Sequence, residues 1–261
     1  MTIDRIVRQA DMTPSSYEPR MPPKRSEVVA QRIVRDIRVS GKTAGDQLET
    51  EAQLCETYQV GRSTVREALR LLELQGVIQI RPGRGGGPVV AFPNSRHLAS
   101  TFALLMQFSE TTFRTVVETR GQIEPFSASL CAQHRSEEVL RALGESVERM
   151  REGINDEVVF LDENHRFHSL VAEGAKNPII SYLTNSLDWV IDGSTLGIKY
   201  TKADRRSVLK AHDEICEAIS FGNSDDAYKA MERHLSDTAT YFEKKFPEVM
   251  SQVVTWELYG L

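Results

Sequence analysis

The chain has 261 residues, enough for two domains with a substantial core. It is 40% hydrophobic and 26% charged, as in a globular protein, and it lacks the apolar run of about 18 residues that would predict a membrane span. Its first residues have neither the apolar core nor the cleavage site of a secretory signal. Three widely spaced cysteines indicate buried thiols in a reducing cytoplasm, not disulfides or a zinc knuckle.

The formal net charge of −5 is unevenly distributed along the chain. Residues 21–94 carry 11 Lys and Arg against 8 Asp and Glu, a balance of +3. Residues 95–261 carry 18 against 26, a balance of −8. A basic front and an acidic back are typical of a nucleic-acid reader joined to a domain that does not touch nucleic acid.

The front of the chain predicts a tail followed by helices. Residues 1–23 are polar, rich in Pro, Ser and Met, and lack helical period, so we expect a flexible tail there. The stretch 26–40 has apolar side chains on one helical face and is stopped by Gly41. Thr50 is the expected N-cap of a second helix, which ends in a short turn at 59–61. With a third helix after this turn, the pattern predicts a helix-turn-helix.

The third helix lies in the block GRSTVREALRLLELQGVIQI at 61–80 and has two different faces. Apolar residues recur at the 3 and 4 spacing of a buried helical face, namely Val65, Ala68, Leu69 and Leu72. Three arginines fall four apart on another stripe, namely Arg62, Arg66 and Arg70. This row begins at a helix N-terminus, where backbone N–H groups attract phosphate, and it suits a helix in a DNA major groove. It also suits solvated charge on an ordinary amphipathic helix.

Two β-prone segments around a glycine-rich tip follow the third helix. VIQI and PVVAF flank PGRGGG, which predicts a hairpin and therefore a winged helix. Arg81, Gly83 and Arg84 are expected in the wing, where glycines let the backbone approach a phosphate or the minor-groove floor. A nucleotide-binding P-loop is excluded because no Lys-Ser/Thr pair follows and no helix begins after Gly87.

The rest of the chain has helical period and lacks strand-like alternation. We therefore expect a mainly α protein, with an N-terminal winged helix-turn-helix and an all-α antiparallel bundle of about seven helices. The expected parts are a winged-helix domain at 24–92, a linker at 93–96, the bundle at 97–247 and a C-terminal tail at 248–261. Helices are expected near 95–109, 112–133, 136–151, 156–174, 177–197, 203–221 and 224–245.

Three histidines of the expected bundle are placed to converge. Asn164 and His168 are i and i+4 and so share a helical face, while His212 and His234 stand among apolar residues of two later helices. Imidazoles and an oxygen donor at a bundle centre suit zinc, nickel, iron or manganese. Each histidine taken alone is more often a hydrogen-bonded core residue, so that alternative stays open.

Residues 24–91 resemble the winged-helix domain of the GntR family of bacterial transcription regulators. The blocks GRSTVREALRLLELQGVI and RPGRGGGPVV carry the resemblance, together with the stretch 48–54. It implies that Arg62 and Arg66 read bases and that Gly83 lies close to DNA. The family usually has a basic residue where this chain has Ala52. This difference bears on which operator sequence is bound and not on whether the domain binds DNA. The expected DNA-binding residues are Arg62, Ser63, Thr64, Arg66, Arg70, Arg81, Gly83 and Arg84.

Residues 95–245 resemble the FCD ligand-binding domain of the FadR branch of that family, through NHRFHSLVAEGAKNPII, AHDEICEAI and MERHL. The resemblance implies a divalent metal, zinc or nickel ahead of manganese or iron, held by Asn164, His168, His212 and His234. Family members have Asp in place of Asn164, so we expect either a lower metal affinity or compensation by an effector carboxylate, a water or a neighbour such as Asp162. Arg120 matches an arginine that helps hold an acidic effector; its alternatives are an ion pair with Glu124 or a surface position.

These patterns predict a cytoplasmic bacterial transcription regulator that is not an enzyme. It is expected to be a homodimeric repressor that binds double-stranded operator DNA, responds to a small organic acid and needs no membrane. The competing interpretation is a metal-dependent enzyme with a three-histidine site and an accessory nucleic-acid-binding domain. Glu163 or Glu214 could be its acid or base, although no HExxH or similar arrangement supports either. A structural nucleoid protein is disfavoured by the histidine-containing bundle.

Overall fold

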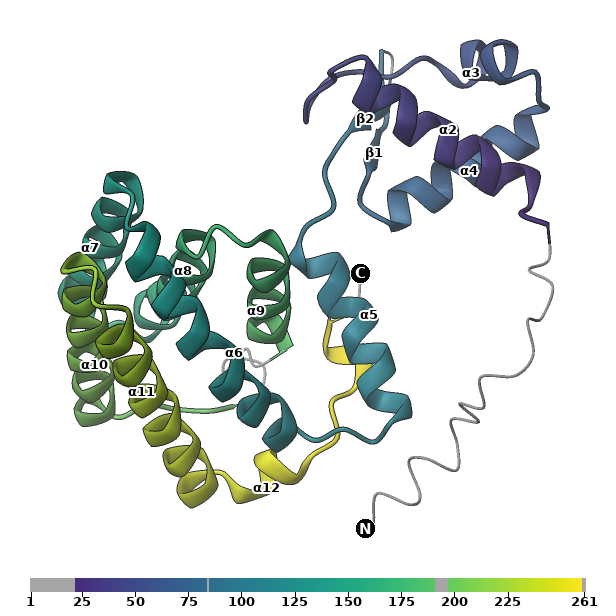
Figure 1. Cartoon of the computed structure of the whole chain (residues 1–261). Helices are drawn as coiled ribbons and strands as arrows, with labels where there is room; N and C mark the ends of the chain where they lie inside the picture. The colour runs from purple at the N-terminus through teal and green to yellow at the C-terminus, as the bar shows by residue number, and fades with distance from the viewer. Residues whose placement is uncertain (1–21, 84, 191–196, 260–261) are drawn as a thin grey trace, which may run out of the picture. The chain divides into compact units, whose positions relative to one another are not determined.

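The structure is a computed structural model and describes residues 22–83, 85–190 and 197–259. These residues form two compact units, which divide between His97 and Leu98 (Figure 1). No helix of the described ranges is both long and apolar enough to cross a lipid bilayer.

The first unit consists of three helices and a hairpin. The helices are α2 (Arg25–Val39), α3 (Glu51–Tyr58) and α4 (Arg62–Leu74), and β1 (Ile78–Arg81) pairs antiparallel with β2 (Gly87–Val90). Apolar side chains from all of these elements share one core, which includes Ile33, Leu54, Val65, Leu69 and Val90. The expected winged helix-turn-helix is therefore confirmed.

Single residues fix the helix ends that shape this unit. Thr50 Oγ1 accepts from the Gln53 backbone N–H at 3.4 Å, and the Gln53 side chain accepts from the Thr50 N–H at 2.9 Å, which caps the start of α3. Gln59 is the C-cap of α3, and its φ of 54° turns the chain toward α4. Gly76 follows α4 with a φ of +71°, and a Cβ at this position would lie 2.3 Å from the His97 ring. Glycine is the residue that fits this turn.

The wing is tied to the rest of the first unit by hydrogen bonds. Gln47 Nε2 donates to the carbonyl oxygens of Gly85 and Gly86 at 3.2 and 3.3 Å, which holds the tip. The Ile80 N–H donates to Glu73 Oε1 at 3.0 Å, which joins β1 to the last turn of α4. The wing therefore has a fixed position relative to α4.

The second unit is an all-α bundle, as expected. Its elements are α5 (Ser95–Phe108), α6 (Phe113–His134), α7 (Glu137–Glu152), α8 (Glu157–Gly174), α9 (Pro178–Val190), α10 (Lys202–Ser220), α11 (Ser224–Lys245), α12 (Pro247–Ser251) and a 3-10 turn (Trp256–Tyr259). α5 begins inside the range 93–96 expected as a linker, and its first residues belong to the first unit. Part of the helix expected at 177–197, namely residues 191–196, lies outside the described residues.

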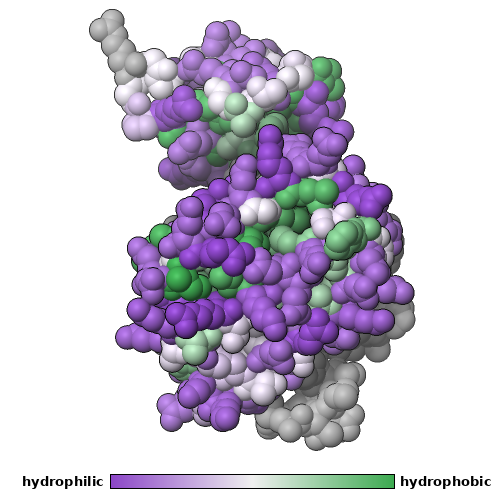
Figure 2. Space-filling model, turned by 90° about the vertical axis from the view of Figure 1, so that its left-hand side faces the viewer, coloured by the Kyte–Doolittle hydropathy of each residue, from purple (hydrophilic) through white to green (hydrophobic). Residues whose placement is uncertain are grey.

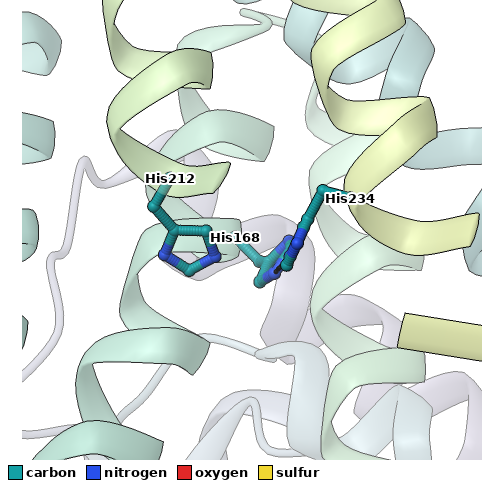
Figure 3. A group of neighbouring side chains, drawn as sticks. All are labelled: His168, His212 and His234. Carbon is teal, nitrogen blue, oxygen red and sulfur yellow. Dashed lines mark hydrogen bonds between the residues drawn. The ribbon is translucent and has the colours of Figure 1, made fainter. Parts of the chain in front are cut away.

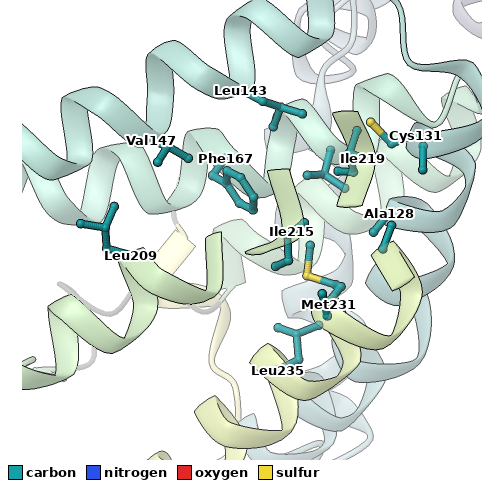
Figure 4. Packing of buried hydrophobic residues seen from close by; sticks show 14 of the residues in the cluster. Ala128, Cys131, Leu143, Val147, Phe167, Leu209, Ile215, Ile219, Met231 and Leu235 are labelled. Atoms are coloured by element: carbon teal, nitrogen blue, oxygen red, sulfur yellow. The ribbon is translucent and has the colours of Figure 1, made fainter. Parts of the chain in front are cut away.

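The helix α6 lies at the centre of the bundle and packs against α8, α9, α10 and α11 (Figure 1). One core lies where α6, α7, α8, α10 and α11 meet, and it includes Leu143, Phe167, Ile215 and Met231 (Figure 4). Each of these helices thus turns an apolar stripe inward. Polar side chains on the inner faces of α6, α8, α10 and α11 are therefore held in a largely apolar interior.

The segment expected as a C-terminal tail at 248–261 packs against the bundle over much of its length. Val253 pairs with Thr112 at the start of α6, and Val254 is fully buried. Trp256 Nε1 donates to Ser100 Oγ at 2.8 Å, and its backbone N–H donates to Gln107 Oε1 at 2.9 Å. Residues 253–256 therefore secure α5 to the bundle.

Candidate nucleic-acid interface and metal centre

The arginines of α4 lie on its exposed face. Arg62, Arg66 and Arg70 are exposed, whereas the apolar stripe beginning at Val65 is buried in the core of the first unit. Arg66 Nε donates to Glu51 Oε2, at the start of α3, at 2.9 Å. This bond uses Nε alone, so the two terminal nitrogens of Arg66 can still reach an outside acceptor.

The start of α4 and the wing add further groups. The residue before α4 is a glycine, which has no side chain to cap the helix, so the first backbone N–H groups can meet an anion. Ser63 is exposed and Thr64 half-buried at this end. Arg81 is exposed at the end of β1, and Gly83 is exposed with a φ of +98°. Arg84, also expected to contact DNA, lies outside the described residues.

Three histidines meet inside the bundle (Figure 3). His168 of α8, His212 of α10 and His234 of α11 each offer a ring nitrogen, and these nitrogens lie within 4.8 Å of one another. The exposed fractions of the three residues are 2%, 0% and 5%. The Nε2 atoms of His168 and His234 are 3.4 Å apart. The structure thus brings together three histidines from three helices.

His212 is the least satisfied of the three side chains. Both of its ring nitrogens are buried without a hydrogen-bond partner in the described part of the chain, and its ring stacks on Phe167 with centroids 3.8 Å apart. A buried polar atom left unpaired costs about 1–3 kcal/mol, so packing alone does not explain this histidine. Burial is the main cause that lowers the pKa of His212 well below its usual range and that of His234 to about 3. Both rings are therefore neutral near pH 7, the form that binds metal ions.

A buried network of charged groups adjoins the histidines. The Nδ1–H of His168 donates to Glu124 Oε2 at 2.5 Å, and Arg120 Nε donates to the other oxygen of that carboxylate at 2.5 Å. Arg120 also forms an ion pair with Asp188 Oδ1 at 2.9 Å, and the other oxygen of Asp188 lies 3.0 Å from His165 Nδ1. Burial would raise the pKa of Glu124, but the charge of Arg120 and the hydrogen bond from His168 lower it to about 2. The carboxylate is therefore ionised at neutral pH.

Asn164 lies beside the histidines in a small cavity. A space of about 40 Å³ is lined by Asn164, His168, His234 and Arg120, among others. Asn164 is half-buried in α8, and its side chain makes no hydrogen bond to another described residue. The cavity has room for an ion or roughly one or two waters. Asp162, the expected compensating carboxylate, is exposed and lines a separate pocket of about 520 Å³ between α8 and α9.

Both units match known families. Residues 25–86 match the family described as bacterial regulatory proteins, gntR family, and residues 115–237 match the FCD domain. The chain is a GntR-family transcription regulator. Its two domains are those of the FadR-type architecture, which accords with the expectation from the sequence.

This regulator is similar to curated transcription regulators along most of its length. It is 26% identical over 209 residues to the HTH-type transcriptional regulator LutR of Bacillus subtilis (strain 168), covering 78% of the chain and 94% of LutR. It is 26% identical over 221 residues to the HTH-type transcriptional repressor NanR of Enterobacter sp. (strain 638), covering 83% of the chain and 84% of NanR. The solved Streptococcus agalactiae GntR structure aligns with a TM-score of 0.70 at 25% identity, covering 83% and 99% of the two chains.

The competing interpretation as an enzyme is excluded, because GntR-type regulators are not enzymes. The two residues that could have served as acid or base, Glu163 and Glu214, also have other partners. Glu163 bonds Ser146 and Arg149 at 2.7 and 2.6 Å, and Glu214 pairs with Arg233 at 3.1 Å. Neither carboxylate belongs to the histidine group.

Two residues of the network were not identified from the sequence of the regulator as part of the site. From the sequence, Glu124 was considered only as a partner of Arg120. Its bond to His168 joins two different helices, and residue spacing along the chain cannot predict such a bond. Asp188 stands in the stretch LTNSLDWV, where nothing distinguishes it from a surface residue. His165, three residues before His168, bonds Asp188 and is not in the histidine group.

The metal-free regulator is expected to lose stability as the pH falls from about 6.5 toward 5. Unfolded histidine binds a proton below about 6.5, whereas folded His234 stays neutral down to about 3. The unfolded state therefore takes up more protons in this window, and stability falls with pH by at most about 1.4 kcal/mol per pH unit for each such histidine. Urea unfolding at several pH values measures the slope. His134→Gln, at an exposed histidine, is expected to leave the slope unchanged; a flat wild-type profile would contradict the prediction.

Proposed function

We propose that the regulator is a homodimeric repressor in the bacterial cytoplasm, with operator affinity set by a small carboxylate that binds beside a metal-containing helical core. The observation that carries the proposal is the buried His168, His212 and His234 group, with both nitrogens of His212 unpaired among the described residues. Repression is the activity named for NanR. The other parts of the proposal are argued separately below.

The DNA-reading surface is assigned to α4 and the wing. Arg62 and Arg66 project from the exposed face of α4 and can make bidentate contacts to guanine in the major groove. Ser63, Thr64 and Arg70 are assigned to phosphates on either side, with the helix N-terminus. The wing contributes Arg81, Gly83 and Arg84 at the adjacent backbone or minor groove.

The metal is assigned to His168, His212 and His234, with Asn164 as a weaker fourth ligand. Buried imidazole nitrogens, with those of His212 unpaired among the described residues, fit zinc or nickel better than the harder cations. A divalent ion in such a site supplies a positive centre that can bind an anionic ligand. Elemental analysis of protein purified without a chelator or metal-affinity tag is expected to find about one equivalent per chain.

The effector is assigned to the space between α8 and α9. The cavity beside the histidines, at about 40 Å³, is too small for an organic acid. The neighbouring pocket of about 520 Å³ shares Leu161 and His165 with it, and is within the size range of small-molecule sites. Asp188 lines this pocket and holds Arg120. An effector carboxylate is proposed to take the place of Asp188 at the Arg120 guanidinium.

The bundle is proposed to carry the dimer contact. Figure 2 shows a surface that is mostly hydrophilic and carries separate hydrophobic patches. Several large apolar residues of the bundle are exposed, including Leu105, Phe108 and Ile179. A two-fold dimer would present two winged-helix domains to two half-sites on DNA. These half-sites would be about one turn of the DNA helix, roughly 34–36 Å, apart. The effector can change this arrangement only by binding one of two domain arrangements more tightly than the other.

A gel shift with the DNA upstream of the protein's own gene tests the proposal. The protein is expected to retard this DNA more strongly than unrelated DNA at the same salt concentration, and one of a panel of small organic acids is expected to release it. The same gel shift is repeated with the DNA upstream of neighbouring genes. If none of these fragments is bound more strongly than unrelated DNA, the regulatory assignment is contradicted.

Arg120→Lys is expected to remove most of the thermal stabilisation given by the acid that releases DNA. Lysine keeps the charge but loses the planar fork that binds two carboxylate oxygens at once. Arg205→Lys is a matched control, because Arg205 is also buried and pairs with Glu157 on another helix. An acid-induced shift in melting temperature that is equal in wild type and Arg120→Lys would refute the role of Arg120.

A further inference from the structure

The metal centre as assigned lacks a carboxylate among its direct ligands. Position 164 offers a neutral amide, and Asp162 is exposed in a different pocket. Three neutral imidazoles and an amide bring no negative charge to a divalent ion. Burying such an ion without an opposite charge nearby is costly, so in the absence of an effector carboxylate the charge is expected from another part of the chain.

The charge lies in the network behind His168. Glu124 and Asp188 are both buried, at 2% and 5% exposed, and Arg120 lies between them. Two carboxylates and one guanidinium leave an excess of one negative charge in the bundle interior. This excess is next to the histidines, because Glu124 bonds His168 directly.

The bond between Glu124 and His168 also determines which imidazole nitrogen faces the centre. Glu124 is paired with the Arg120 guanidinium, and a carboxylate in such a pair accepts hydrogen bonds, so Nδ1 of His168 carries the proton that it donates. A neutral ring then has its lone pair on Nε2, and this atom lies 3.4 Å from His234 Nε2. Arg120, which donates to the other oxygen of Glu124, holds the carboxylate in this orientation.

We propose that Glu124 is the positioning carboxylate of this metal centre and that it supplies, through His168, the negative charge that Asn164 does not. A carboxylate behind a metal-bound histidine fixes the tautomer and makes the imidazole a stronger donor. The inference rests on the proposed metal site. Glu124 is not itself a ligand in this scheme, since both of its oxygens are engaged by His168 and Arg120.

The test is the affinity of the full-length protein for Zn²⁺, measured by competition with a chromophoric chelator. Glu124→Gln keeps the size of the side chain and an oxygen acceptor but removes the charge. It is expected to weaken Zn²⁺ binding about 10- to 100-fold. Glu163→Gln is the matched control: Glu163 is also buried and bonds a guanidinium and a second donor, but no histidine. It is expected to bind Zn²⁺ as the wild type does.

Asn164→Asp separates loss of charge from general damage. Adding this change to Glu124→Gln restores a carboxylate beside the centre and is expected to recover most of the lost affinity. It is expected to improve binding less in the wild-type background, where Glu124 already supplies charge. Equal gains in the two backgrounds, or unchanged affinity in Glu124→Gln, would overturn the inference. Failure of the wild-type protein to bind Zn²⁺ would instead remove the proposed metal site itself.

A measurement on the metal-free wild-type protein covers the case in which Glu124→Gln does not fold. Nitrogen-15 NMR of labelled histidines distinguishes protonated from unprotonated ring nitrogens. His168 is expected to carry its proton on Nδ1 and to have a bare Nε2. The reverse tautomer would show that Glu124 does not set the orientation of this ring.

Discussion

The His212→Leu variant is expected to melt at a higher temperature than the wild type when both are free of metal, and to gain nothing from added Zn²⁺. The reason is that both nitrogens of His212 are buried without a partner in the described structure, at 0% exposure. Replacing them with an apolar side chain of similar size removes an unpaired polar group worth about 1–3 kcal/mol. At a Zn²⁺ concentration 1,000-fold above its dissociation constant, the wild type gains about 4 kcal/mol, which the variant lacks.

Thermal unfolding with and without Zn²⁺ measures both effects in one experiment. His134→Leu is the control, because His134 is exposed near the end of α6 and outside the histidine group. It is expected to respond to Zn²⁺ as the wild type does. A His212→Leu protein that is less stable without metal and still stabilised by Zn²⁺ would identify His212 as an ordinary core residue.

The second large effect is expected at Arg62. Arg62→Ala should weaken binding to the operator by about 1–3 kcal/mol, roughly 5- to 150-fold, and relax the preference for one base pair. Arg62 is exposed at the first position of α4, so its removal leaves the core of the first unit intact. The proposed bidentate contact to guanine would be lost without a replacement, whereas the proposed phosphate contacts would remain.

Fluorescence anisotropy on the operator and on single-base variants, at several salt concentrations, separates the possible roles of Arg62. A base-reading arginine changes the ranking of the variants, whereas a phosphate-binding one lowers affinity for all of them and reduces the salt dependence. Arg141→Ala, at a 74% exposed side chain of α7, is expected to change neither. Full operator affinity in Arg62→Ala would contradict the proposed reading surface.

The sequence predicted most of the fold because each element carries a local signal. The 3 and 4 spacing from Val65 to Leu72 marks one buried stripe of α4, and Gly83 marks the wing tip where a positive φ is needed. The same periodicity placed His212 and His234 on inward faces of their helices. Such signals depend on neighbours along the chain and need no knowledge of the partner helix.

The charged network behind the histidines could not be predicted in this way. Periodicity indicates which face of α6 is buried, but not that Glu124 reaches His168, which is 44 positions away. Asp188 pairs with Arg120 from α9, a different helix from the α6 of Arg120. Pairings between atoms on different helices depend on rotamers and helix positions, which only the folded structure fixes.

The attachment of α5 has a consequence for how the protein is made. Ser100 in α5 accepts a hydrogen bond from Trp256, which is 156 positions later in the chain. The core of the winged-helix domain, in contrast, consists entirely of residues before α5. Domains fold in the order in which they leave the ribosome. A newly synthesised chain therefore passes through a stage in which the winged-helix domain is complete while α5 still lacks its contacts with Trp256, and α5 gains them only after residues 253–256 have been translated.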